Sequence, residues 1–257
     1  MASTVLVEVR GNVQIMTLSN PEARNAATLE MAEAMAAALD ELDRNPALQV
    51  GIITGAGGTF CAGMDLKGFL QGKRPSIAGR GFCGLTQKPP HKPLIAAVEG
   101  YALAGGFELV LACDLIVAAR TAKFGLPEVK RGLIAAAGGM FRIVDQLPRK
   151  IAMELLVTGD PISAEDAARW GLINQVVPDG TELVAALALA EKITANAPLA
   201  VQASKRVAAG IDDGVITAEQ DAWKRSNREM RTVFRSEDAM EGPLAFAQKR
   251  APVWKAR

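Results

Sequence analysis

The sequence predicts an α/β fold in which a core of strands and helices is followed by a helical C-terminal region. Apolar runs at 50–54, 94–98 and 115–119 alternate with segments of helical period, as expected for strands covered by helices. Hydrophobic residues make up 49% of the 257-residue chain but aromatic residues only 5%, which is typical of aliphatic side chains packed between a sheet and its helices. From about residue 190 the pattern is helical almost throughout. We therefore expect an α/β core over 1–190 and a helical region over 191–257.

The chain begins with a predicted β-hairpin followed by a helix. Two apolar runs, 5–9 and 13–18, flank the turn sequence Arg10-Gly11-Asn12. Apolar residues then recur at helical spacing over 29–42, until Asn45-Pro46 ends the pattern.

The strand at 50–54 leads into a Gly- and Ala-rich loop. Gly55 and Gly57 follow the strand as in a dinucleotide fingerprint, but Phe60 replaces the third glycine, and the chain has no phosphate-binding Gly-Lys-Ser/Thr loop. We therefore expect neither a nicotinamide cofactor nor a nucleoside triphosphate. Cys61 in this loop could be a nucleophile, but no general base is visible near it, so a buried thiol is the favoured interpretation.

Residues 71–84 show no clear period. They are rich in Gly, Lys, Arg and Ser, which predicts a mobile loop or a short, poorly fixed helix. Such a loop could cover a site, but a plain surface excursion is an equally good interpretation.

Residues 98–114 are the most informative stretch. An apolar strand runs into a Gly/Ala loop that starts a helix at Gly105–Gly106, and Glu108 follows in its first turn. A helix start leaves backbone N–H groups unpaired and attracts negative charge, so Gly105 and Glu108 could present an N–H and a carboxyl to one point. The alternative is a tightly packed turn with a surface glutamate.

Glu128 has a similar position later in the chain. It follows Pro127, which fits the first position of a helix. A glutamate there is often only a favourable partner of the helix dipole.

The rest of the chain is predicted to be mainly helical. Gly138-Gly139 opens a helix, a capping sequence at 158–163 precedes a helix that runs to Trp170, and 176–177 forms a short edge strand. From residue 181 helices are expected with breaks at Pro198, Gly210, Gly214 and Gly242-Pro243, and the last is a basic amphipathic helix over 244–250.

The composition excludes several classes of partner. The net charge of +1 does not favour nucleic acid. No apolar run approaches the roughly 20 residues needed to span a bilayer, so no membrane partner is expected. The mean hydropathy of +0.14 is high, which favours apolar surface buried between subunits.

The cysteine and histidine content bounds the chemistry. Cys61, Cys83 and Cys113 lie far apart without a C-x-x-C pair, which predicts free thiols in a reducing compartment. The single histidine, His91, makes both a His-based metal site and a Ser-His-Asp triad improbable, and a solvated residue in a proline-rich connector is the favoured interpretation. The segment 1–4 lacks the features of a secretion signal, so a cytoplasmic location is expected.

The loops around Ala62 and Gly105 and the two glutamates suggest one site. Two backbone N–H groups at one point form an oxyanion hole. Two nearby carboxyls push their pKa values apart, so that one is ionised while the other is protonated. Glu108 and Glu128 would then perform acid/base chemistry beside a thioester carbonyl or a similar group.

Five motifs in order along the chain carry a resemblance to a known family. They are Asn20-Pro21-Glu22-Ala23-Arg24-Asn25-Ala26, Thr59-Phe60-Cys61-Ala62-Gly63-Met64-Asp65-Leu66, Gly100-Tyr101-Ala102-Leu103-Ala104-Gly105-Gly106-Phe107-Glu108-Leu109, Phe124-Gly125-Leu126-Pro127-Glu128 and Thr158-Gly159-Asp160. Together they resemble the enoyl-CoA hydratase/isomerase (crotonase) family over nearly the whole chain.

The resemblance implies a crotonase-like spiral of ββα units and a C-terminal helical trimerisation region. It further implies a homotrimer or a dimer of trimers, with an acyl-CoA thioester bound between the two loops. No metal and no separate cofactor is implied, because coenzyme A is part of the substrate.

The resemblance also implies roles for individual residues. The oxyanion-hole N–H groups would be those of Ala62 and Gly105, and Glu108 and Glu128 would be the acid/base carboxyls. The residues expected to bind CoA are Arg24, Ala26, Asp65 and Leu66, together with Phe246 and Lys249, which could reach the CoA of a neighbouring subunit.

Two departures from the common hydratase pattern leave the substrate open. Ala104 stands where a third glycine is frequent, and 132–142 replaces the usual proline-containing run that should border the acyl pocket. We expect a 2-enoyl-CoA hydratase. The alternatives are an isomerase or a specialised acyl-CoA dehydratase of the same family, or a non-catalytic acyl-CoA binder.

Overall fold

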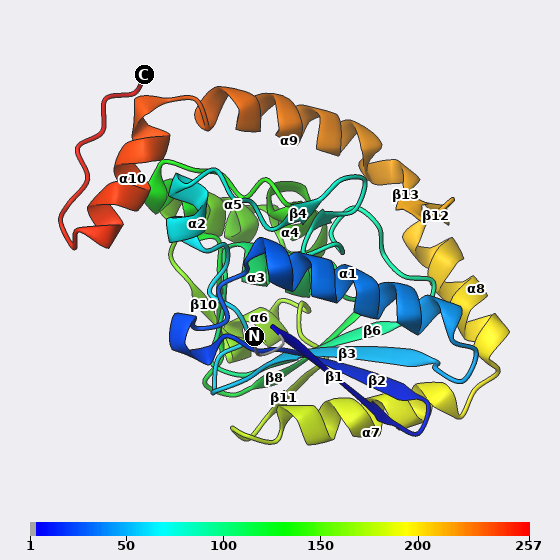
Figure 1. The fold of residues 1–257 in the computed structure, drawn as a ribbon. Helices are drawn as coiled ribbons and strands as arrows, with labels where there is room; N and C mark the ends of the chain where they lie inside the picture. The colour runs from blue at the N-terminus through cyan, green and yellow to red at the C-terminus, as the bar shows by residue number, and fades with distance from the viewer. Residues whose placement is uncertain (1–3) are drawn as a thin grey trace.

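The computed structural model describes residues 4–257, and the expectation about Met1–Ser3 lies outside them. A long sheet runs through the molecule between helices on both faces, and the C-terminal helices extend along its periphery (Figure 1). The α/β core and the helical C-terminal region are confirmed.

The long sheet has six strands in the order β1-β2-β3-β6-β8-β11. The β1–β2 hairpin is antiparallel, and the other neighbours are parallel. Its strands are β1 (Val5–Arg10), β2 (Val13–Leu18), β3 (Val50–Gly55), β6 (Leu94–Val98), β8 (Leu115–Ala119) and β11 (Gln175–Val177). The predicted hairpin, the three predicted core strands and the edge strand are all confirmed.

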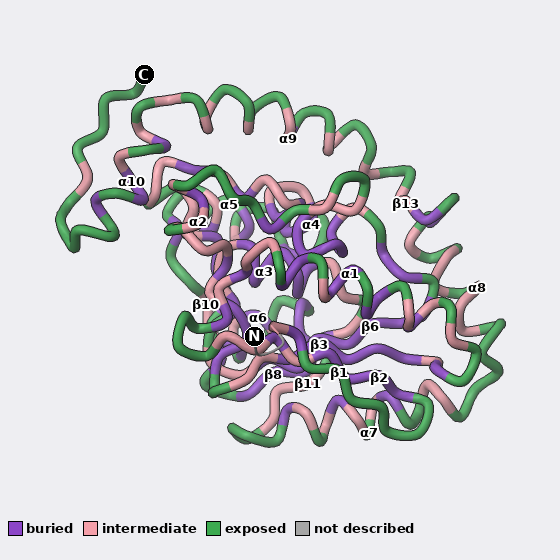
Figure 2. Tube along the Cα trace, viewed as in Figure 1, coloured by how far each residue is buried: buried purple, intermediate pink, exposed green. Residues whose placement is uncertain are grey.

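Successive residues of the central strands point to opposite faces of the sheet. Ile53 packs under α1 (Leu29–Arg44), whereas its neighbour Ile52 packs against α7 (Glu182–Thr194). Buried residues are therefore concentrated in these strands, while the peripheral helices are largely exposed (Figure 2). The expected division at residue 190 falls within α7.

A second, shorter sheet crosses the end of the first. It contains β7 (Tyr101–Leu103), β9 (Lys123–Gly125) and β10 (Ile162–Ser163), and Cys61 adds a single bridge to Ala102 of β7. Residues 101–103 had been predicted as loop, because the three-residue strand is too short to show a period. The turns β6–β7–α3 and β8–β9–η2 each contribute a long-sheet strand, a short-sheet strand and then a helix, which is the expected ββα spiral.

The helices of the core follow these strand pairs. They are η1 (Pro21–Ala23), α2 (Leu66–Leu70), α3 (Gly105–Leu111), η2 (Pro127–Arg131), α4 (Gly139–Gln146), α5 (Arg149–Thr158) and α6 (Ala164–Arg169). Pro127 occupies a first-turn position as expected, although η2 is a 3₁₀ helix. Ser163 caps α6 by accepting a hydrogen bond from the Asp166 N–H, as the capping sequence predicts.

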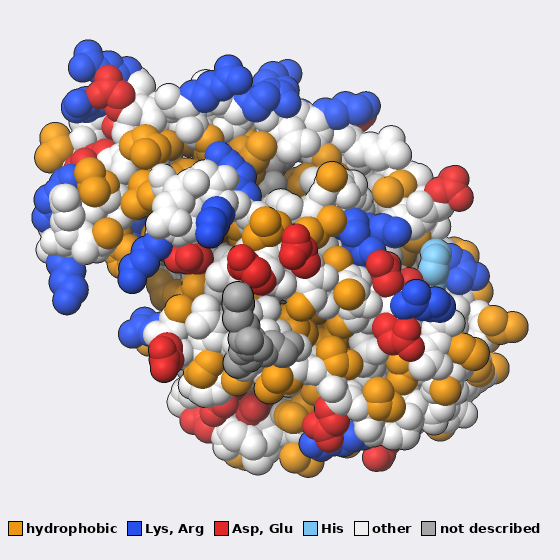
Figure 3. Space-filling view, viewed as in Figure 1, with side chains coloured by type: hydrophobic (Ala, Val, Ile, Leu, Met, Phe, Trp, Pro, Cys, Tyr) orange, Lys and Arg blue, Asp and Glu red, His pale blue; other side chains and the backbone are white. Residues whose placement is uncertain are grey.

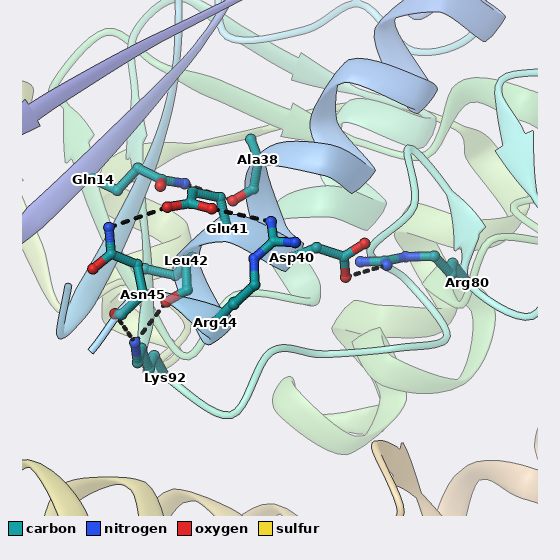
Figure 4. A network of polar contacts seen from close by, with 9 residues as sticks. All are labelled: Gln14, Ala38, Asp40, Glu41, Leu42, Arg44, Asn45, Arg80 and Lys92. Carbon is teal, nitrogen blue, oxygen red and sulfur yellow. Dashed lines mark hydrogen bonds and ion pairs between the residues drawn. The ribbon is translucent and has the colours of Figure 1, made fainter. Parts of the chain in front are cut away.

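The segment predicted as a mobile loop or short helix contains a small antiparallel hairpin instead. Its strands are β4 (Ser76–Ile77) and β5 (Gly81–Phe82). Arg80 in the turn bonds to the Gly84 carbonyl and forms an ion pair with Asp40 of α1 at 2.5 Å (Figure 4). These long-range contacts fix the hairpin, and local sequence does not reveal them.

The C-terminal end of α1 is closed by a buried lysine. Lys92, just before β6, donates from Nζ to the carbonyls of Leu42 and Asn45 at 2.6 and 2.7 Å (Figure 4). Because the last carbonyls of a helix have no partner within it, this cation satisfies part of the terminus and opposes its partial negative charge.

The C-terminal region contains α8 (Pro198–Ala209), β12 (Ile211–Asp212), β13 (Val215–Ile216), η3 (Thr217–Glu219), α9 (Gln220–Val233) and α10 (Glu237–Ala247). The helix breaks predicted at Gly210 and Gly214 are confirmed, and the β12–β13 hairpin, which the sequence does not predict, lies there. Gly242-Pro243 lies inside α10, so the predicted break there is wrong. A Cβ at Gly242 would lie 2.0 Å from the Arg131 carbonyl oxygen, because α10 packs closely on η2 at this point.

The face shown in Figure 3 carries a group of Lys and Arg side chains over α9, whereas acidic and basic side chains are interspersed over the rest of it. Among residues 4–257 no single helix is both long and apolar enough to span a membrane; α7 and α8 would qualify only as a pair, and they are bent by 106°.

Candidate active site

The register of the short sheet brings the helix starts together. Cys61 lies beside Ala102, and Ala102 pairs with Phe124. Counting three residues onward from Cys61 and Ala102 leads to Met64 and Gly105. Equivalent positions in successive turns of the spiral therefore present their backbones side by side.

Gly105 is the first residue of α3, and its N–H has no acceptor in the described chain. The preceding Ala104 has a φ of +52°, a conformation that favours glycine, so its methyl group is accommodated in a strained turn. A Cβ at Gly63 would lie 3.3 Å from the Gly105 nitrogen, so the 62–65 loop passes directly beside this donor.

The other predicted donor, Ala62, is already engaged. Its N–H donates to the Arg24 carbonyl at 3.0 Å, and the Gly63 N–H points to the Cys61 sulfur at 3.4 Å. The prediction for Ala62 is therefore wrong in this structure. The Met64 N–H, by contrast, has no acceptor anywhere in residues 4–257.

The sequence alone allows two alignments of the loop around 62–64 with the loop around Gly105. Aligning the two loops by their short strands matches Met64 with Gly105, whereas matching them by their small residues favours Ala62. The pairing of Cys61 with Ala102, which decides between the two, is a tertiary contact.

Glu108 is buried at 4% exposure in the first turn of α3. Its Oε1 accepts a hydrogen bond from the Gly139 N–H at 2.8 Å, at the start of α4. Burial raises the pKa of Glu108 to about 7, although the Gly139 and Ala137 N–H groups and the positive charge of Arg142 oppose the rise. Glu108 therefore exchanges its proton near neutral pH.

Glu128 in η2 is the second carboxyl of the site. Its Oε2 is buried without a hydrogen-bond partner in the described part of the chain. Burial, followed by the charge of Glu108, raises the pKa of Glu128 well above its ordinary value. Because each carboxyl raises the cost of charging the other, ionisation of one favours the protonated form of its neighbour.

Cys61 lies beside these groups but is unsuited to be a nucleophile. It is fully buried, and burial raises the pKa of its thiol to about 12. The thiolate is the reactive form, so the interpretation of Cys61 as a buried thiol is supported.

The expected CoA-binding segments lie side by side. The Ala27 N–H donates to the Gly63 carbonyl, and the Asp65 N–H donates to the Ala27 carbonyl. Asp65 also caps α2, which begins with Leu66, by accepting from the N–H groups of Lys67 and Gly68.

A cavity of about 160 Å³ lies next to these segments. Its lining includes Ala27, Thr28, Asp65, Lys67 and Lys73. The lining is balanced in charge, because Glu30 and Asp65 accompany the two lysines. Arg24 is exposed and Ala26 half-buried nearby in sequence, and neither lines the cavity.

Comparison with known proteins identifies the family. A family model described as enoyl-CoA hydratase/isomerase matches residues 8–257. The chain belongs to the enoyl-CoA hydratase/isomerase family. Its relatives include the enoyl-CoA hydratase EchA19 of Mycobacterium tuberculosis, which is 45% identical with 98% of this chain and 96% of that protein covered. The carnitinyl-CoA dehydratase of Proteus mirabilis is 41% identical, with both chains covered completely.

Solved structures of the family share the fold. The carnitinyl-CoA hydratase from Mycobacterium avium has a TM-score of 0.97 at 57% identity, and an enoyl-CoA hydratase from Mycobacterium tuberculosis has a TM-score of 0.79 at 50% identity. Both comparisons cover all of both chains. The crotonase fold is thus confirmed, and the relatives are named as both hydratases and dehydratases of acyl-CoA thioesters.

In this member of the family, the unusual 132–142 run contacts the candidate carboxyl directly. Gly138 has a φ of +108°, and Gly139 opens α4 with its N–H on Glu108. A Cβ at Gly139 would lie 3.0 Å from both Cγ and Oε1 of Glu108, so the glycine allows this close approach. Leu133, earlier in the run, packs against Phe69 and Ala239.

Phe246 and Lys249, the two C-terminal residues expected to bind CoA, have different surroundings. Phe246 of α10 stacks under the guanidinium of Arg131, which lies 4.3 Å from the ring centroid, in the same helix η2 that carries Glu128. Lys249 is exposed beyond the end of α10. Their predicted contacts with CoA stay predictions.

Proposed function

We propose that this protein is an enoyl-CoA hydratase that adds water reversibly across the 2,3 double bond of a 2-enoyl-CoA thioester. One observation carries the proposal: the backbone N–H groups of Met64 and Gly105 have no acceptor in residues 4–257, and Glu108, in the first turn of the helix that Gly105 opens, is coupled to a second buried carboxyl, Glu128. The family membership and the relatives named as hydratases support it.

In this proposal the N–H groups of Met64 and Gly105 hold the thioester oxygen. Negative charge develops on that oxygen when water attacks C3, and the two donors stabilise it without reorganisation. Removing one such donor typically costs about 2.7 to 4 kcal/mol of barrier.

The two carboxyls divide the proton transfers. Ionised Glu108 takes a proton from the attacking water, whose oxygen bonds to C3, and protonated Glu128 gives its proton to C2. Both C–H and C–O bonds form at the expense of the C2–C3 double bond. A proton then passes from Glu108 to Glu128 through solvent, which restores the starting state.

The test is a panel of 2-enoyl-CoA substrates of increasing chain length. Hydration removes the absorbance of the conjugated double bond, and we expect this loss with at least one substrate. Glu128→Gln should lower the rate by at least about 10²-fold, whereas the exposed Glu154→Gln should leave it unchanged. No absorbance change at any chain length would contradict the proposal, and full activity of Glu108→Ala would favour isomerisation instead.

A second candidate is a dehydratase of a specialised 3-hydroxyacyl-CoA. It is favoured by the relatives named as carnitinyl-CoA dehydratase and hydratase. The same site would run the reaction in reverse, so the panel also includes unsubstituted 3-hydroxyacyl-CoA thioesters and carnitinyl-CoA. A much higher kcat/KM for carnitinyl-CoA than for the unsubstituted thioesters would favour the second candidate.

A further inference from the structure

Arg142 of α4 is a buried cation that joins three separate parts of the chain. It is 5% exposed. Its Nε and Nη2 donate to the two carboxylate oxygens of Glu219 in η3, both at 2.7 Å, and Nη2 also donates to the Thr86 carbonyl at 2.7 Å. Such a two-pronged pairing fixes the guanidinium in position as well as neutralising it.

The C-terminal region holds Glu219 in place from the other side. Trp223 Nε1 donates to Glu219 Oε2 at 3.2 Å, and the Trp223 ring packs edge-on against Phe141, which precedes Arg142 in α4. The Arg142 guanidinium also lies 5.6 Å from the centroid of the Trp223 ring.

On one side, the contacts of Arg142 lead to Glu108. Arg142 Nη1 has no hydrogen-bond partner in the described residues, and a Cβ at Gly138 would lie 3.0 Å from it. The next residue, Gly139, donates its N–H to Glu108. The unpaired Nη1 of Arg142 therefore lies at the turn whose N–H group holds the Glu108 carboxyl.

On the other side, the contacts of Arg142 lead to Gly105, one of the two proposed oxyanion-hole donors. Thr86, whose carbonyl accepts from Arg142, also accepts from the Phe82 N–H through its hydroxyl at 2.9 Å. A Cβ at Gly105 would lie 2.4 to 2.9 Å from three carbons of the Phe82 ring. Phe82 thus packs directly over Gly105, and Thr86 fixes its backbone.

We propose that Arg142 is a positioning residue of the active site, which anchors both the Glu108 carboxyl and the Phe82–Gly105 contact to the C-terminal region through Glu219. This inference rests on the proposed function of the same site. A buried ion pair is by itself weak evidence for stability, so we assign the Arg142–Glu219 pair a role in positioning the site.

The charges around Glu108 make the inference testable by pH. Glu108 faces Glu128 from η2 and Arg142 from α4, with Glu219 of η3 behind the arginine. Beyond Cys113 lies the ion pair of Asp114 with Lys205. Arg142 lowers the pKa of Glu108 against the effect of burial. Because Glu219 pairs with the Arg142 guanidinium, we expect its negative charge to offset part of that influence.

The experiment measures the pH dependence of kcat for the wild type, Arg142→Met and Glu219→Gln. Arg142→Met removes the cation and should move the acidic limb of the kcat profile to higher pH. Glu219→Gln removes the opposing negative charge and should move this limb to lower pH. We expect each shift to be roughly half a pH unit or more. Arg142→Lys should lie near the wild type in pH dependence, with a lower kcat because the fork to Thr86 and Glu219 is lost. Gln146→Met, one turn along α4, is the matched control and should leave the profile in place.

A general loosening of the fold would move the acidic limbs of both variants in the same direction. Opposite shifts would therefore not result from it. Shifts in the same direction, or an unmoved limb in Glu219→Gln, would overturn the inference. If Arg142→Met does not fold, Glu219→Gln, which keeps the shape of the pair, decides alone. If the wild type turns over no acyl-CoA, the proposed function fails separately, and the Glu108 titration is then followed by infrared difference spectroscopy without substrate, with the same two shifts expected.

Discussion

Glu108 illustrates how a single residue combines a structural cost with a chemical role. Its carboxyl is buried, and one hydrogen bond from Gly139 and the charge of Arg142 only partly compensate the loss of water. The carboxyl therefore ionises near neutral pH rather than near 4.5. A general base with a pKa close to the working pH is the most effective one.

The same burial predicts how stability depends on pH. The folded protein keeps the Glu108 proton up to about pH 7, while the unfolded chain releases it near 4.5, so stability falls as the pH rises through this window. The difference corresponds to about 3 kcal/mol at most. Glu108→Gln, which stays neutral, should gain up to that amount over the wild type between pH 5 and pH 8.

Urea unfolding at the two pH values measures this gain, with Glu154→Gln as the exposed control. If the stability gained by Glu108→Gln over the wild type does not grow with pH, the Glu108 carboxyl is not buried in its charged form.

Gly139 gives a second prediction at the scale of one residue. Gly139→Ala would place a methyl group 3.0 Å from Oε1 of Glu108, so the carboxyl must move away from the hydrogen bond that holds it. A displacement of about 1 Å typically costs about 10²-fold in rate, and we expect kcat to fall by roughly 10- to 100-fold with little change in stability. Steady-state kinetics checks this against Met140→Leu, a neighbour in the same turn; equal rates for both variants would contradict it.

At the scale of elements, the helix α1 depends on a residue far away in the sequence. Lys92 is 4% exposed and donates to two carbonyls at the end of α1 (Figure 4). Asp43 in the last turn of α1 accepts from the N–H groups of His91 and Lys92. The helix end and the entry to β6 are therefore fixed to each other.

Lys92→Met keeps the length of the side chain but leaves the carbonyls of Leu42 and Asn45 without their donor. Each buried polar group left unsatisfied costs about 1 to 3 kcal/mol, so we expect the free energy of unfolding to fall by at least about 2 kcal/mol. Chemical denaturation measures the change, and Lys88→Met at an exposed position is the control. A loss no greater than that of the control would mean that Lys92 is dispensable.

At the scale of the whole molecule, much apolar surface is uncovered. The C-terminal region exposes large hydrophobic side chains on three of its segments: Leu199 and Val207 of α8, Met240, Leu244 and Phe246 of α10, and Val253 and Trp254 of the tail. Patches of this kind mark protein interfaces, consistent with the expectation of a homotrimer or a dimer of trimers.

That expectation is tested by the mass in solution. Sedimentation velocity should give a species of three or six times the chain mass of 27.1 kDa at micromolar concentration. Leu199→Asp and Val207→Asp, on the exposed face of α8, would show whether that face contributes to the assembly. A wild-type monomer at all concentrations would contradict the prediction.

The sequence by itself determined the elements with strong periodicity and the chemistry of the glutamates. The hairpin, α1, the core strands and the positions of Glu108 and Glu128 at helix starts follow from apolar spacing and from the glycines and prolines that begin and end elements. Tertiary structure alone decided the rest. The hairpins β4–β5 and β12–β13 have two-residue strands too short to show a period, and the pairing of Cys61 with Ala102 made Met64, rather than Ala62, the free donor. Arg142 gained its partners from segments far away in the chain, because a buried charge is placed by what surrounds it and not by its neighbours in sequence.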